Sequence, residues 1–172
     1  MQDRILAMIL SCILAMVIMY FIVVTIILTF FRSFHITVGR LHFKARLSVR
    51  KQYIWEPVKN DEKIRKAFIG YTIIGILVVL TTVGQFYVMA YGYPIETAVI
   101  ACFIYILAWW SSRAAYMQRK YWEEHASANK EFTLASKDVF KVRMALFKSA
   151  LVAEMVMSLT YMIYMLNYGV YY

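Results

Sequence analysis

Four long blocks of apolar residues divide the chain, at 5–31, 67–91, 95–112 and 144–165. A helix of about 20 apolar residues crosses the hydrocarbon core of a bilayer, which is roughly 30 Å thick. The first block is longer than this, because 27 residues at about 1.5 Å each give about 40 Å of helix. The pattern predicts an all-α polytopic membrane protein with four transmembrane helices in a single domain, 1–172.

The connections between the blocks predict how the helices are joined. Gly92-Tyr93-Pro94 is too short for anything but a turn, so the second and third helices must run antiparallel. Good helix formers fill 113–129, which predicts that the third helix continues beyond the membrane. We expect a turn at 132–136, with Ser136 as the N-cap of the fourth helix. The third and fourth helices would then form a cytoplasmic helical hairpin.

The first polar segment contains a different pattern. Residues 41–50 alternate strictly between apolar and polar side chains, as in a strand with two different faces. Residues 34–38 precede it, and Gly39-Arg40 could form a hairpin turn. The pattern predicts a short basic β-ribbon that docks a partner; an irregular loop against anionic lipid stays open as the alternative. The residues expected to contact a partner or lipid head groups are His42, Lys44, Arg46, Arg50 and Lys51.

Composition and charge indicate how the chain is oriented. Of the 172 residues 62% are hydrophobic and the net charge is +9, with 17 of the 19 Lys and Arg residues in 32–66 and 113–143. Cytoplasmic loops of membrane proteins carry such an excess, so we expect both segments in the cytoplasm and both termini on the outer or periplasmic side of a bacterial inner membrane. This bias explains the charge without nucleic acid. Trp109 and Trp110 are the expected anchors at the inner head-group level.

Few polar residues lie inside the predicted spans. Glu154 is near the middle of the fourth, where an ionised carboxylate is disfavoured by roughly 3 kcal/mol. It is either a functional group or a neutral carboxyl bonded to a neighbouring helix, and the candidate partners on the second span are Thr81, Thr82 and Gln85. Lys148 is close enough to the cytoplasmic end for its ammonium group to extend to the head groups.

No set of residues in the sequence suggests catalysis. A nucleophile with its base, a pair of acidic residues, a glycine-rich phosphate loop and a metal-ligand spacing are all missing from the printed sequence. We therefore expect a protein that is not an enzyme and that needs no cofactor or metal.

Two classes of function remain. The first is a non-catalytic subunit or assembly factor of a larger inner-membrane complex, of secretion, translocation or energy-transducing type. Its partners would be other membrane subunits or copies of itself, anionic lipid and a soluble cytoplasmic protein. The second is a homo-oligomeric channel or carrier that uses Glu154. The sequence favours the first class, because transporters usually carry paired intramembrane polar residues or broken helices in repeated halves.

Overall fold

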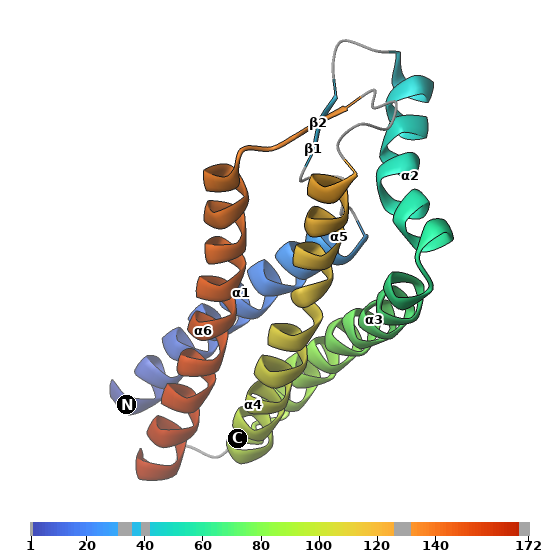
Figure 1. Cartoon of the computed structure of the whole chain (residues 1–172). Coiled ribbons are helices and arrows are strands. Elements are labelled where there is room, and N and C mark those ends of the chain that lie inside the picture. Colours follow the sequence, from blue (N-terminus) through green and yellow to red (C-terminus); the bar gives the residue numbers. More distant parts are fainter. Residues whose placement is uncertain (1, 31–35, 39–41, 126–131, 169–172) are drawn as a thin grey trace.

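The computed structural model describes residues 2–30, 36–38, 42–125 and 132–168 of the chain, and most of them are helical (Figure 1). The elements in chain order are α1 (Gln2–Phe30), β1 (Ile36–Val38), α2 (Phe43–Asn60), α3 (Glu62–Ala90), α4 (Pro94–Ser111), α5 (Arg113–Glu124), β2 (Phe132–Leu134) and α6 (Lys137–Tyr168).

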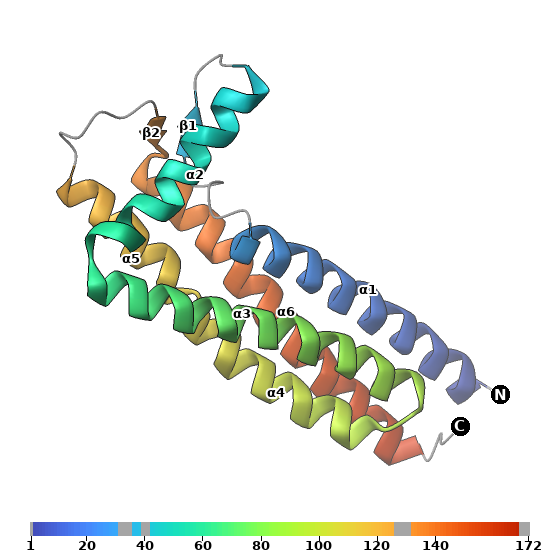
Figure 2. The same cartoon turned by 90° about the vertical axis from the view of Figure 1, so that its right-hand side faces the viewer.

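Four of these helical segments are long and apolar enough to cross a membrane: α1, α3, α4 with its continuation α5, and α6. This confirms the expected number of spans. The four pack side by side, with α1 mainly against α3 and α6, and α4 mainly against the same two helices. Helix α1 begins and α6 ends at one end of the bundle, whereas α2, α5 and both strands lie at the other end (Figure 2). We call the second the basic end, because the described parts of the two basic segments gather there.

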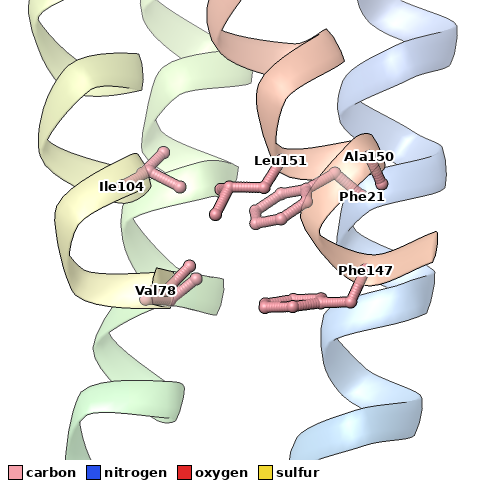
Figure 3. Close-up of a cluster of buried hydrophobic side chains, with 7 residues drawn as sticks. Phe21, Val78, Ile104, Phe147, Ala150 and Leu151 are labelled. Atoms are coloured by element: carbon pink, nitrogen blue, oxygen red, sulfur yellow. The ribbon is translucent and has the colours of Figure 1, made fainter. Parts of the chain in front are cut away.

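All four helices contribute to the core of the bundle. Phe21 of α1, Val78 of α3, Ile104 of α4 and Leu151 of α6 are buried in one cluster (Figure 3). The rings of Phe21 and Phe147 stack with their centroids 6.2 Å apart. Because lipid is as apolar as these side chains, close packing and not the hydrophobic effect holds the helices together here.

The predicted turn at 92–94 joins α3 to α4. The amide of Tyr93 donates to the carbonyl of Val88 at 3.3 Å, and the amide of Gly92 donates to that of Met89 at 3.0 Å. This pair of bonds is the Schellman ending of a helix, which needs a positive φ, and Gly92 has a φ of 73°. Pro94 then begins α4, where a missing amide hydrogen costs nothing. The antiparallel connection is confirmed.

The predicted basic ribbon is wrong for most of its length. Residues 43–50 are the first part of α2, and the proposed turn at 39–40 lies outside the described residues. The buried side chains of α2 include Val49, Tyr53 and Pro57, which are four residues apart and thus share one helical face. The four-residue spacing extends to residue 57 and is typical of a helix, whereas the alternation that predicted a strand covers only ten residues. Phe43 is consequently 81% exposed, although the alternation placed it on the same face as Val49.

A single residue ends α2 and starts α3. Asp61 is extended, with a φ of −127°, and its carboxylate accepts hydrogen bonds from the amides of Lys63 at 2.8 Å and Ile64 at 3.2 Å. This is a regular N-cap of α3. The break lets α2 turn across the basic end of the bundle, away from the direction of α3 (Figure 2).

The two strands come from different polar segments. Strand β1 lies within the stretch 34–38 that was expected to be extended, but it pairs antiparallel with β2, not with residues 41–50. Ile36 lies opposite Leu134 and Val38 lies opposite Phe132. The expected turn at 132–136 is therefore wrong for its first three residues, because β2 finds a partner almost a hundred residues earlier in the chain. Ser136 does cap α6, since its hydroxyl accepts from the amide of Val139 at 3.3 Å.

Both helical extensions beyond the apolar blocks are present. Helix α5 continues α4 after Ser111 and Ser112, whose hydroxyls bond the carbonyls of Ala108 at 2.9 Å and Trp109 at 2.7 Å. Such bonds compete with the helix's own ladder and mark the junction. Helix α6 begins at Lys137, several residues before its apolar part.

Candidate functional site

The basic end has a hydrophobic core of its own, separate from that of the membrane bundle. We call it the aromatic cluster; its buried members are Ile36, Val49, Tyr53, Tyr121, Trp122 and Phe132. They come from β1, α2, α5 and β2, so the cluster joins segments of both polar regions. The ring of Trp122 stacks on Tyr53 at 6.1 Å and meets the ring of Phe132 edge-on at 5.0 Å. Aromatic pairs in such geometries add stability beyond the area that they bury.

A proline inside α2 allows one polar bond within this cluster. Pro57 has no amide hydrogen, so the carbonyl of Tyr53, four residues earlier, loses its helical partner. The indole nitrogen of Trp122 donates to that carbonyl at 2.9 Å. A buried carbonyl without a donor would destabilise the fold, and the indole removes this cost. The bond fixes α2 against α5.

A buried arginine joins α5 to the start of α6. Arg119 is 9% exposed; its Nε contacts the carboxylate of Glu123 at 2.8 Å, and an Nη donates to the carbonyl of Ala135 at 3.1 Å. Its guanidinium also lies 4.8 Å from the ring centroid of Phe140. From the sequence, Arg119 counted only as one of the basic residues of 113–143. The only signal in the sequence was Glu123 four residues later, a spacing that favours ion pairs on a helix.

The candidate contact residues lie on two different faces of α2. Lys44, Lys51 and Lys59 share one face with Trp55, which we call the lysine face. Arg46 and Arg50 are one turn apart on another side, the arginine face. All these side chains are exposed, and His42 is exposed at the N-cap position without a side-chain capping bond. The structure thus separates residues that the alternation had placed on one side of a ribbon.

The intramembrane polar residues form a compact cluster. The side-chain amide of Gln85 donates to Glu154 at 2.6 Å, contacts the hydroxyl of Ser158 at 3.0 Å and donates to the carbonyl of Thr97 at 3.3 Å. Of the three partners that the sequence offered for Glu154, Gln85 is therefore the one that contacts it. Thr81 and Thr82 bond carbonyls of their own helix. Ser158 and Thr97 were missed; Ser158 is one turn from Glu154, which is the only local signal.

Two oxygens of this polar cluster have no partner in the described part of the chain: Oε2 of Glu154 and Oε1 of Gln85. Glu154 is completely buried. An ionised carboxylate here would be an unpaired buried charge, whereas a carboxyl that keeps its proton makes Oε2 a donor. Thr97 is three residues from the start of α4, about 5 Å along the helix, so the cluster lies nearer the α3–α4 turn than the middle of these helices.

Lys148 lies against two aromatic rings. Its ammonium lies 4.3 Å from the ring centroid of Trp109 and 5.8 Å from that of Tyr116. Both rings belong to the part of α4 and α5 that leads to the basic end. Trp109 and Trp110 are 40% and 49% exposed on the last turn of α4, as anchors at a head-group level would be. The cation over the ring fits the expected extension of Lys148 toward the interface.

Among residues 2–30, 36–38, 42–125 and 132–168, no group of three or more His, Cys, Asp and Glu side chains could hold a metal ion. Comparisons of the chain with protein-family models, with curated proteins and with solved structures found no match.

Proposed function

We propose that this protein is a non-catalytic integral membrane subunit or assembly factor of a larger complex, and that it docks a soluble partner at its basic end. The observation that carries the proposal is the aromatic cluster. Loops that served only to orient the spans would need positive charge but no ordered core. Here the cluster, the indole bond to α2 and the contacts of Arg119 hold α2, α5 and the two strands in one arrangement.

The arginine face is the proposed contact surface. Arg46 and Arg50 are exposed near the start of α2, one to two turns before Tyr53 and on the same side of the helix, and the cluster holds Tyr53 in place. Guanidinium groups bind carboxylates with two parallel hydrogen bonds, and Arg is enriched where protein surfaces meet. The partner that fits this face is an acidic surface of a soluble protein.

Purification in a gentle detergent followed by mass spectrometry tests the proposal. We expect wild type to carry stoichiometric partners. The double variant Arg46→Gln/Arg50→Gln should lose the soluble one. The matched control is Lys137→Gln/Lys141→Gln, which removes the same charge from the exposed start of α6 and should keep it. A lone monodisperse monomer from wild type, or equal loss in both variants, would contradict the proposal.

The orientation is part of the same proposal. We place the basic end in the cytoplasm of a bacterial cell and the termini on the periplasmic side, as the positive-inside rule requires. The test is a cysteine at Lys51 in a variant in which Cys12 and Cys102 are replaced by serine. An impermeant maleimide should label it only after the membrane is opened, and labelling of intact cells would overturn the orientation.

The polar cluster favours a second candidate, a homo-oligomeric channel or carrier. Its support is a pair of buried oxygens, on Glu154 and Gln85, that have no partner among the described residues and that a transported proton or cation would satisfy. In proteoliposomes, Glu154→Gln should abolish ion flux if this candidate is right. If the variant changes only which proteins co-purify, the subunit proposal gains.

A further inference from the structure

The lysine face of α2 contains a hollow that the proposed docking of a soluble protein does not use. Its volume is about 570 Å³, and its lining consists of Ser48, Lys51, Gln52, Trp55, Glu56 and Lys59. We propose that this hollow binds the phosphate of an anionic phospholipid and so holds α2 against the inner surface of the membrane.

The position of Trp55 supports a lipid as the occupant. Its ring is half-exposed, and its centroid lies 6.0 Å from that of Phe68 in the second turn of α3. The apolar block of α3 begins at residue 67, so this face of α2 is turned to the place where α3 enters the membrane. Tryptophan is enriched at that level of a bilayer, because its ring is apolar and its N–H group is polar.

The charges of the lining fit a phosphodiester. Lys51 and Lys59 are exposed, and no ion pair of either is found within the described ranges. The carboxylate of Glu56 accepts a hydrogen bond from the side-chain amide of Gln52 at 3.0 Å. Two lysines and one glutamate leave the lining with a net charge of +1, which complements the single negative charge of a phosphodiester. By contrast, Lys66 on the first turns of α3 is paired with Glu62 at 3.0 Å.

Titration of the full-length protein in detergent with short-chain phospholipids, followed by native mass spectrometry, tests this site. Wild type should bind phosphatidylglycerol more tightly than phosphatidylcholine or phosphatidylethanolamine. A basic residue near an anionic membrane surface contributes about fivefold, so Lys51→Gln/Lys59→Gln should weaken phosphatidylglycerol binding by roughly tenfold or more. Glu56→Gln should strengthen it severalfold, because it removes the one negative charge of the lining.

The control variant Lys137→Gln/Lys141→Gln removes equal charge elsewhere and should stay within about twofold of wild type. Equal affinity for the three lipids, or an equal loss in the two double variants, would overturn the proposal. So would binding of soluble glycerol phosphate as tightly as the lipid, because the site would then recognise an anion without a membrane. Loss of the soluble partner in the arginine-face variant does not affect these results, so the two proposals fail separately.

Discussion

The indole bond between Trp122 and the carbonyl of Tyr53 gives the sharpest prediction about how the basic end is held together. Trp122→Phe keeps an aromatic ring in the cluster but removes the donor. The carbonyl then stays buried without a partner, because Pro57 cannot supply an amide hydrogen. Leaving a buried acceptor unsatisfied costs about 1–3 kcal/mol, and we take about 2 kcal/mol, or roughly 30-fold in the opening equilibrium of α2.

Amide hydrogen exchange in detergent micelles measures this opening directly, since local unfolding of a helix exposes its amides. Peptides covering 45–58 should lose protection by roughly 30-fold in Trp122→Phe. Trp110→Phe is the matched control: that ring is 49% exposed on α4, outside the aromatic cluster, and its replacement should leave α2 unchanged.

A double-mutant cycle separates the hydrogen bond from the packing of the ring. In Pro57→Ala the new amide of residue 57 can donate to the carbonyl of Tyr53, as in any regular helix. Trp122→Phe should then cost about 1 kcal/mol less than it does in wild type, because the carbonyl already has a donor. The reasoning is refuted if Trp122→Phe costs as much free energy in the Pro57→Ala background as in wild type. It is also refuted if Trp122→Phe and Trp110→Phe leave the amides of α2 equally protected from exchange.

Three further predictions concern the membrane bundle and are tested by thermal unfolding in detergent. Gln85→Leu removes the shared donor of the polar cluster and should destabilise the folded protein by about 2 kcal/mol. Glu154→Gln keeps the size and the hydrogen-bonding capacity of the side chain and should cost less than about 1 kcal/mol. A larger cost for Glu154→Gln than for Gln85→Leu would contradict the geometry. Leu151→Ala should cost about 2 kcal/mol in lost packing, and Val152→Ala, 41% exposed, almost nothing; equal effects would refute the assigned core face. Lys148→Met should cost about 0.5–1 kcal/mol through the lost cation–π contact, and no change would show that the ammonium contributes only solubility.

Local chemistry accounts for the parts of the fold that were predicted. The ending of α3 depends on a glycine that tolerates a positive φ, and the start of α6 on a serine hydroxyl that accepts from the helix amides. Both signals lie within a few residues of the feature that they produce. The four spans are also predicted from local information. A helix in lipid makes its backbone hydrogen bonds within itself, so a span needs only enough consecutive apolar residues.

The polar cluster was predictable only in part. A carboxyl in an apolar span had to find a hydrogen-bond partner, and Gln85 was among the three residues named for it. The choice between Gln85, Thr81 and Thr82 depended on the rotation of α3 about its axis. Both threonines satisfied their hydroxyls within their own helix, which an amide at position 85 cannot do as readily.

The sequence by itself determined the number of spans, their approximate ends and the side of the bundle on which the basic residues gather, because hydrophobicity and charge act on each segment independently. Only the tertiary structure decided what the basic segments form. Alternation at 41–50 suggested a strand, but Val49 and Tyr53 are buried in the aromatic cluster on one face of a helix, and β1 paired with a strand from the other polar segment. Contacts between residues far apart in the chain carry that choice, and no short pattern encodes them.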